Sequence, residues 1–214
     1  MGKSGCVTPE RILHAAYELF AARGFDGATT QEICSLAQAN IAAVNYHYGS
    51  KENLYRAVWE YGDAQARERW EQSIPSDSSP EQRLRQFIEL RVLAVVREDE
   101  NGWYARLIHR EMANPSPLAE ELHERFLHPK RRWFQALVRE IVGENVSERE
   151  TRLAGFCIHS PLIHLNEMRT RPHPQPLPPD GGPLADPAAL VETIYTFALA
   201  GLRELRRRHE AESR

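Results

Sequence analysis

One short stretch of the chain, from Thr29 to Lys51, concentrates side chains suited to contacting nucleic acid; it reads TTQEICSLAQANIAAVNYHYGSK. Asn45, Tyr46 and His47 stand where the solvated face of a helix would normally carry lysine and glutamate. Amide, hydroxyl and imidazole groups form hydrogen bonds to base edges and to phosphates. We therefore interpret this stretch as an element that contacts DNA.

Two short helices joined by a tight turn are expected to position these side chains. Thr29 is suited to cap the first helix, and Glu32 can reach back to complete a capping box. Asn40 is suited to cap the second helix, with Ala43 or Val44 facing inward. Helices of about seven or eight residues with a break of about three or four have the proportions of a helix-turn-helix, whose second helix enters the major groove.

The flanking sequence resembles a known family. Thr8-Pro9-Glu10 predicts a helix start with a cap and a proline in the first turn, and Gly24 predicts the end of that helix. The segments RILHAAYELFAARGFDGATTQEI and NYHYGSKENLYRAV resemble, over roughly residues 8 to 60, the N-terminal domain of TetR-type transcriptional regulators. Within that family, YARLIHREMANPSP (104–117) and NYHYGSK resemble the CecR/CerR-like subgroup.

The resemblance implies an all-α fold with an N-terminal three-helix helix-turn-helix head and a helical C-terminal body for effector binding and dimerisation. The expected DNA-binding head comprises residues 1–60, with the helix-turn-helix motif at about 29–48, and the expected body comprises residues 61–214. The implied function is that of a dimeric, ligand-responsive transcriptional regulator. It would be a repressor that a small molecule releases from a palindromic operator in double-stranded DNA.

The same resemblance assigns roles to residues of the head. Phosphate contacts are implied for Thr30, Tyr46, His47 and Lys51. Positions facing the groove are implied for Gln31, Ala42, Ala43 and Asn45. The chemistry agrees, because glutamine and asparagine can pair with adenine through two hydrogen bonds, and alanine methyls suit the methyl group of thymine. Two residues depart from the family pattern: Gln38, where many members have a turn glycine, and Asn45, where many have tyrosine.

Composition sets outer bounds. The 214 residues are 42% hydrophobic and 27% charged, as in an ordinary globular protein. No segment approaches the ~18 consecutive apolar residues of a membrane span, and the N-terminus lacks the layout of a signal peptide. We therefore expect a cytoplasmic protein with no membrane partner. Cys6, Cys34 and Cys157 are widely spaced and form no CxxC pattern, so neither a disulfide framework nor a metal site is indicated, and no cofactor is expected.

The charge of the head argues against a broad basic surface. Residues 1–60 carry five Lys or Arg against six Asp or Glu, a formal net charge of −1. Affinity for DNA is therefore expected to depend on dimerisation and on geometry more than on bulk charge. Helix N-termini, with their free N–H groups, can supply further phosphate contacts.

The rest of the chain has apolar residues at intervals of three and four, which predicts helices and no long strand. About nine helices are expected in all. Those after the head are expected from Ser50 to about Gln72, from Ser79 with a capping box to Gln82, from Trp103 to Ala113 after a break at Asn101-Gly102, from Leu118 to Val142 with a kink or break at Pro129, from Ser147 with a cap at Glu150 to about Glu167, and from Asp186 onward. The segment from Met168 to Ala185 is rich in proline and is expected to be a loop ordered only in part.

The last two helices are expected to form the homodimer interface. Their apolar faces contain small residues, which let helices approach closely. These faces comprise Leu153, Phe156, Cys157, Ser160, Ile163 and His164 on one helix, and Ile194, Ala198, Gly201 and Leu202 on the other. The alternative is that the faces pack inside the monomer; the need for two DNA-reading heads favours the dimer.

Aromatic and basic residues of the body are candidates for the effector site. They are Trp103, Arg106, His109, Arg110, Trp133, Phe156 and His159. Arg106 and Arg110 lie four residues apart on one helix face, where they could hold an anion or pair with Glu111 and neighbouring carboxylates. Aromatic side chains at the other positions are equally expected in a helix core.

The residue content suggests two alternative classes of function. A metal-binding or enzymatic domain could use His109, His123, His128, His159 and His164. The spacings His123/His128 and His159/His164 are both i,i+5, which places the side chains on different faces, unlike the i,i+4 pair of HExxH. The chain also has no activated nucleophile arrangement and no glycine-rich phosphate loop, so we expect no enzyme. An architectural DNA binder without an effector would differ only in lacking a pocket.

Overall fold

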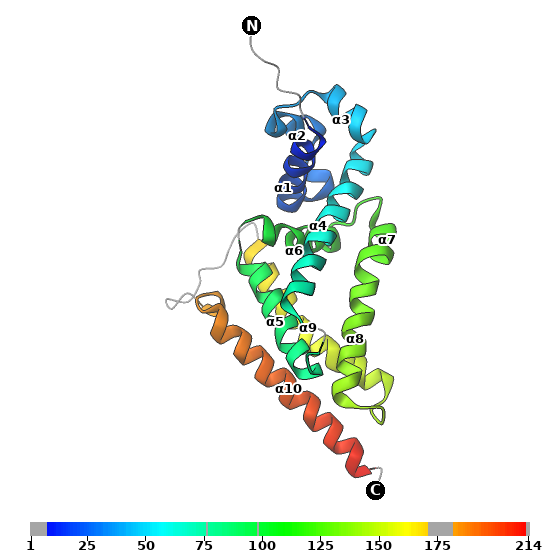
Figure 1. The fold of residues 1–214 in the computed structure, drawn as a ribbon, viewed down its shortest axis with the longest axis vertical. Helices are drawn as coiled ribbons and strands as arrows, with labels where there is room; N and C mark the ends of the chain where they lie inside the picture. Colours follow the sequence, from blue (N-terminus) through cyan, green and yellow to red (C-terminus); the bar gives the residue numbers. More distant parts are fainter. Residues whose placement is uncertain (1–7, 76, 98, 171–181, 213–214) are drawn as a thin grey trace. The chain divides into compact units, whose positions relative to one another are not determined.

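The structure is a computed structural model that describes residues 8–75, 77–97, 99–170 and 182–212. The elements in chain order are α1 (Pro9–Gly27), α2 (Thr30–Ala37), α3 (Ile41–Tyr48), α4 (Lys51–Ser73), α5 (Pro80–Val96), α6 (Glu100–Ala113), α7 (Ala119–Leu122), the π-helical turn η1 (His123–Leu127), α8 (His128–Val142), α9 (Glu148–Thr170), the 3-10 turn η2 (Gly182–Leu184) and α10 (Pro187–Glu212) (Figure 1). The residues described contain no strand, and the predicted all-α fold with an N-terminal helix-turn-helix is confirmed.

Side-chain caps fix where most helices begin. Capping boxes are present at Thr29 for α2 and at Ser79 for α5, as predicted. Asp186 Oδ1 accepts a hydrogen bond from the Ala189 amide at 3.0 Å and caps α10. Each cap satisfies a backbone donor that the first turn of a helix leaves unpaired. Among the described helices, α1, α7 and α8 begin without a side-chain cap hydrogen bond. The first of them follows Thr8 and begins with Pro9, whose fixed φ suits a first turn.

Of two predicted interruptions between or within helices, one is absent and the other is present. The predicted break at Asn101-Gly102 is wrong, since α6 begins at Glu100 and runs through both residues. Tertiary contacts override the local signal there, because Glu100 accepts a hydrogen bond from Tyr61 at 3.0 Å. The predicted kink near Pro129 is confirmed: the chain passes through η1 directly before α8, where proline cannot donate to the preceding turn.

The proline-rich segment is described only at its ends. The helix α9 extends to Thr170, three residues past the predicted Glu167, and η2 forms the end of the segment nearest to α10. The expected partly ordered loop falls mainly on residues 171–181, which lie outside the described residues.

The chain forms two compact units. The head unit comprises Met1–Glu68 and Glu98–His123, and the body unit comprises Arg69–Arg97 and Glu124–Arg214. The helix α6 therefore belongs to the same unit as the helix-turn-helix. The functional division expected at residue 60 remains a prediction.

Aromatic side chains fill the core of the head unit. Phe20 packs edge-on against Tyr55 with ring centroids 4.7 Å apart, and Trp59 packs against Tyr104 of α6 at 5.9 Å. Trp103 of α6 lies edge-on to Tyr17 of α1 at 5.3 Å. These contacts pack α6 against α1 and α4, so three helices, α1, α4 and α6, support the helix-turn-helix formed by α2 and α3.

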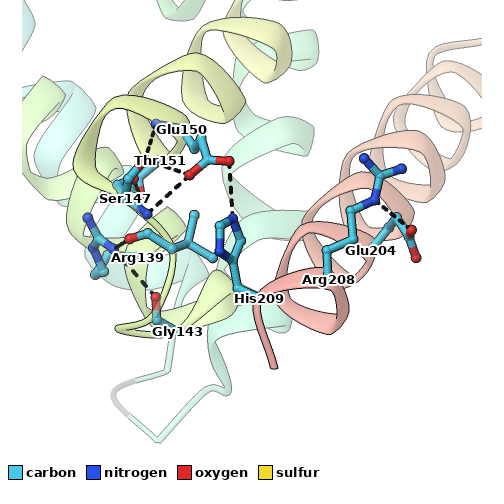
Figure 2. A network of polar contacts seen from close by, with 9 residues as sticks. Arg139, Gly143, Ser147, Glu150, Thr151, Glu204, Arg208 and His209 are labelled. Carbon is cyan, nitrogen blue, oxygen red and sulfur yellow. Dashed lines mark hydrogen bonds and ion pairs between the residues drawn. The ribbon is translucent and has the colours of Figure 1, made fainter. Parts of the chain in front are cut away.

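The body unit has an aliphatic core and a network of polar contacts, here called the clasp, that consists of Arg139, Ser147, Glu150 and His209. Leu84, Ile88 and Val92 of α5 are fully buried, with Val138 of α8. Figure 2 shows the clasp at the start of α9, where Glu150 accepts hydrogen bonds from the hydroxyl and the amide of Ser147 at 2.5 and 3.3 Å.

The clasp joins three helices. Glu150 also lies 3.1 Å from Nε2 of His209 in α10, and these hydrogen bonds, that of Ser147 first, lower the pKa of Glu150. Arg139 of α8 donates to the carbonyl groups of Gly143 and Val146 in the turn before α9 (Figure 2). The clasp therefore holds the α8–α9 turn and the end of α10 to the start of α9.

Candidate nucleic-acid interface

The start of α2 is held by a tightly bonded carboxylate. The Glu32 amide donates to Thr29 Oγ1 at 3.2 Å, and Glu32 Oε2 accepts from the Thr29 hydroxyl and amide at 2.7 and 2.9 Å. Arg23 of α1 donates to Glu32 Oε1 at 2.6 Å. The hydrogen bonds from Thr29 and then the Arg23 guanidinium lower the pKa of Glu32 to about 2. The first helix of the motif is thus capped and tied to α1 at once.

The turn between α2 and α3 depends on an unusual backbone conformation. Gln38 has φ 51° and ψ 44°, the left-handed region, and is the sole described residue other than glycine with positive φ. The Ala39 amide donates to the Cys34 carbonyl at 2.8 Å, which satisfies the last turn of α2 in the manner of a Schellman motif. The Gln38 side chain accepts a hydrogen bond from Arg11 at 3.2 Å. The departure from the family glycine is therefore accommodated, at the cost of local strain.

The second helix, α3, is held by hydrogen bonds at both ends, and between them only Val44 is buried. Asn40 Oδ1 accepts from the Ala43 amide at 2.7 Å, as predicted. The Tyr48 hydroxyl donates to the Pro9 carbonyl of α1 at 2.8 Å. Val44, 1% exposed, is the one buried residue of α3. These contacts fix the roll of the helix about its own axis, so its remaining face has a defined direction.

The predicted DNA-contacting residues are distributed over that face and its surroundings. Five of the eight are exposed: Gln31, Ala42, Asn45, Tyr46 and His47. The other three are half-buried: Thr30, Ala43 and Lys51. The Tyr46 side chain is 84% exposed, an extreme value for an aromatic residue. The roles of these eight residues in binding DNA remain predictions.

Cations are few around the helix-turn-helix. Arg23 pairs with Glu32, and Arg56 forms a two-pronged ion pair with Glu121 at 2.8 to 3.0 Å. Lys51 is the first residue of α4, and its ammonium lies 4.2 Å from the centre of the Phe25 ring. This cation–π contact positions the ammonium at a helix N-terminus, where partial positive charge already favours an anion.

Sequence reasoning missed one residue of the exposed face. Ile41 is the first residue of α3 and is 51% exposed, yet it was not among the predicted contacts. The signal available in the sequence was its position directly after the Asn40 cap, outside the apolar face that Val44 defines. Leu36 at the end of α2 is similarly exposed, at 47%.

The candidate effector residues divide between the two units. Trp103, Arg106, His109 and Arg110 lie on α6 in the head unit, and Trp133, Phe156 and His159 lie in the body unit. Trp103 packs against His14 at 5.0 Å as well as against Tyr17. Glu111, one of the carboxylates considered as a partner for the two arginines, accepts hydrogen bonds from Tyr55 and Ser116.

In the body unit, Trp133 and His159 share one aromatic cluster. Trp133 lies edge-on to Trp70 with centroids 4.4 Å apart, and His159 lies 5.6 Å from Phe87 and 5.2 Å from Phe134. Burial, followed by the positive charges of Arg91 and Arg131, lowers the pKa of His159 to about 4. Phe156 does not belong with this cluster, since its side chain is 68% exposed.

An open apolar groove of about 650 Å³ lies between α9 and α10. Its lining includes Cys157 and Pro161 of α9 and Ile194, Ala198 and Gly201 of α10. Large apolar side chains are exposed on the same two helices: Leu153, Phe156, Ile163 and Phe197, of which Phe197 is 78% exposed. A surface of this kind in water marks an interaction site.

Among the residues described, no group of three or more His, Cys, Asp or Glu side chains could hold a metal ion. No helix in the described part of the chain is long and apolar enough to span a bilayer.

Comparison with known proteins agrees with this arrangement. The family model "Bacterial regulatory proteins, tetR family" matches residues 12–58, and the model "HTH-type transcriptional dual regulator CecR, C-terminal domain" matches residues 80–202. The chain therefore belongs to the tetR family of DNA-binding transcriptional regulators. Within that family it falls in the CecR-like subgroup.

Individual relatives are distant. The chain is 23% identical over 173 residues to the probable transcriptional regulator YttP of Bacillus subtilis, covering 79% of this chain and 78% of the relative. It is 28% identical over 130 residues to the dual regulator CecR of Shigella flexneri, covering 56% and 58%. A TetR-like regulator from Rhodococcus has the same fold, with a TM-score of 0.66 at 16% identity over 91% of this chain and 94% of that one.

Proposed function

We propose that the protein is a homodimeric repressor that binds a palindromic operator and leaves it when a small molecule binds the C-terminal part. The observation that carries the dimer is the exposed apolar surface of α9 and α10, which includes Phe156 and Phe197. One recognition helix reads only a few base pairs, so useful specificity requires two heads related by symmetry.

The dimer is tested by placing a charge in the groove. A Cβ added at Gly201 would meet no other atom within 4 Å, so the backbone at this position accommodates the side chain of Gly201→Glu. Glutamate also favours a helix more than glycine does, by up to about 1 kcal/mol. At a twofold interface, however, two carboxylates would be brought together and desolvated. We expect a folded monomer with weak operator binding, measured by sedimentation velocity and by fluorescence anisotropy.

Thr196→Glu is the matched control. Thr196 is an exposed residue of α10 that does not line the groove, so this variant carries the same added charge without entering the interface. It should remain a dimer with normal affinity. A Gly201→Glu protein that still sediments as a dimer would place the interface elsewhere.

For the effector, Trp133 and His159 are the residues we favour, because they share a largely buried aromatic cluster with Phe87 and Phe134. Trp103, Arg106, His109 and Arg110 remain a second candidate group. A tenfold loss of operator affinity requires only about 1.4 kcal/mol of coupling, and operator DNA must weaken effector binding by the same factor.

The effector is sought by screening the intact protein for thermal stabilisation and then measuring operator affinity with each compound. For a compound that lowers the operator affinity of the wild-type protein, His159→Gln should reduce that loss of affinity. His128→Gln, at the first residue of α8 and outside the proposed dimer surface, should leave that response unchanged. Compounds that stabilise the protein without changing operator affinity would favour the alternative of an architectural DNA binder.

A further inference from the structure

Ile41 is an apolar side chain exposed for no reason internal to the fold. It is the first residue of α3 and is 51% exposed. A hydrophobic staple at a helix start joins the residue before the N-cap to the fourth helical residue, here Ala39 and Val44. Ile41 is not one of these two positions, and Val44 is buried, with 1% exposure. An isoleucine contributes nothing to the cap, which Asn40 provides.

The helical register places Ile41 beside Asn45. Residues four apart lie on one ridge of a helix, so Ile41 and Asn45 form one row, and Ala42 and Tyr46 form the next. Val44 and the anchored Tyr48 fix which side of α3 faces the protein. The row of Ile41 and Asn45 therefore borders the most exposed row of the recognition helix.

The N-terminal residues of a recognition helix are those that reach base edges in the major groove. The apolar group that bases present there is the 5-methyl of thymine, whereas adenine presents N6 and N7 to an amide. We propose that Ile41 contacts a thymine methyl group in each half-site, close to the adenine that Asn45 reads. This inference rests on the proposed function of binding a specific operator.

The dimensions agree with neighbouring bases. Four residues separate Ile41 from Asn45, a rise of about 6 Å along the helix axis. Successive bases on one strand are about 3.4 Å apart. The two side chains would therefore reach bases one or two steps apart, which predicts adjacent A·T pairs in the half-site.

The contribution of such a contact matters because the head is poor in positive charge. Residues 1–60 have a formal net charge of −1, and Arg23 and Arg56 are engaged in ion pairs. Weaker attraction to the phosphates leaves a larger share of the affinity to groups that contact the base edges. Isolated exposed apolar residues are common on protein surfaces, and Leu36, 47% exposed on α2, serves as an example of that ordinary case.

The test removes one methyl at a time from the DNA. The full-length protein first selects its operator from random duplexes. Each thymine of the operator is then replaced symmetrically by deoxyuridine, which keeps base pairing and lacks only the methyl. At one position wild type should lose affinity about fourfold per half-site, or about fifteenfold for both, as expected for a buried methyl group. Affinity is measured by anisotropy at one salt concentration.

Two variants separate Ile41 from general effects. Ile41→Ala should bind the thymine operator about as weakly as wild type binds the deoxyuridine operator, and should show no further loss on deoxyuridine. Leu36→Ala should keep the full sensitivity of wild type. Thermal melting confirms that each variant is folded, which is expected because both side chains are exposed.

The outcomes distinguish this inference from the proposed function. A selected operator whose thymine methyls make no difference, or an Ile41→Ala protein that keeps the sensitivity of wild type, overturns the role of Ile41 alone. A failure to select any preferred sequence overturns the operator-binding function and this inference with it.

Discussion

The hydroxyl of Tyr55 in α4 donates a hydrogen bond to Oε2 of the buried Glu111 in α6 over 2.8 Å. The other carboxylate oxygen accepts from the Ser116 amide and hydroxyl at 2.9 and 2.7 Å. A second pair runs in the opposite sense, from Tyr104 of α6 to Asp63 of α4 at 3.0 Å. Buried carboxylates are tolerated when donors surround them, and here those donors join α4 to α6 inside the head unit.

We predict that Tyr55→Phe lowers the free energy of unfolding by about 1.5 to 3 kcal/mol, the usual contribution of a hydrogen bond to a charged group. Burial raises the pKa of Tyr55, so the tyrosine remains a donor. Tyr46→Phe, at a side chain 84% exposed, should leave stability unchanged. Urea denaturation followed by circular dichroism measures both. Equal midpoints for the two variants would show that the buried hydrogen bond adds nothing.

This pair also limits what a shortened protein can be expected to do. Residues 1–60 alone would lack Tyr104 and Glu111, and would leave Tyr55 and Trp59 without their partners from α6. Variants of the full chain are therefore the appropriate material for experiments on DNA binding.

The free energy of unfolding should decrease as the pH is lowered from about 6.5 toward 4, because of His159. The folded protein holds the pKa of His159 at about 4, below its ordinary value of 6.5, through burial and then the charges of Arg91 and Arg131. The unfolded chain therefore takes up the proton first as pH falls. The contribution of neutral His159 is complete above about pH 6.5 and declines toward pH 4, by up to about 1.4 kcal/mol per pH unit.

His159→Gln should remove this part of the pH dependence, and His128→Gln at the first residue of α8 should retain it. Urea midpoints at several pH values between 4 and 7 provide the measurement. Parallel profiles for wild type and His159→Gln would contradict the assigned cause.

At the turn of the helix-turn-helix, Gln38→Gly should stabilise the protein by about 1 kcal/mol, because glycine adopts the left-handed conformation without the Cβ clash. The exposed hydrogen bond from Arg11 would be lost, which reduces the gain slightly. Gln38→Val should be destabilising, since branching at Cβ suits this conformation least. Thermal melting ranks the three proteins, and a valine variant as stable as the glycine variant would contradict the strain.

How far the sequence predicts the structure depends on the distance over which each signal acts. Thr29 with Glu32, Asn40 and Ser79 specify helix starts within a few residues, and all three were predicted. The continuous start of α6 at Glu100 was not predicted, because it depends on contacts with the distant Tyr61.

The candidate sites show the same limit. The local motif identified the recognition helix but left Ile41 unmarked, because its exposure depends on how α3 is anchored to α1. Arg106 and Arg110 were predicted either to hold an anion or to pair with Glu111 and neighbouring carboxylates, and the Glu111 carboxylate is held by Tyr55 and Ser116. Partners from distant helices cannot be read from spacing along one helix.

Two substitutions should separate positioning contacts from base reading. Lys51→Ala should weaken operator and random DNA about equally and reduce the slope of affinity against salt by about one unit per protomer. Asn45→Ala should change which sequences are preferred, since its amide faces outward on α3. Titrations on both DNAs at several salt concentrations measure this. If Lys51→Ala changed the sequence preference and Asn45→Ala weakened binding uniformly, Lys51 would contact bases and Asn45 would contact phosphates, contrary to the assignment.

Selection of binding sites from random duplex DNA by the intact protein tests dimeric operator recognition most directly. We expect a palindrome or near-palindrome whose half-sites are about 34–36 Å apart along the DNA, or a multiple of that distance, so that both recognition helices enter major grooves on one face. Selected sequences that contain only single, unpaired half-sites would contradict binding by a symmetric pair of heads.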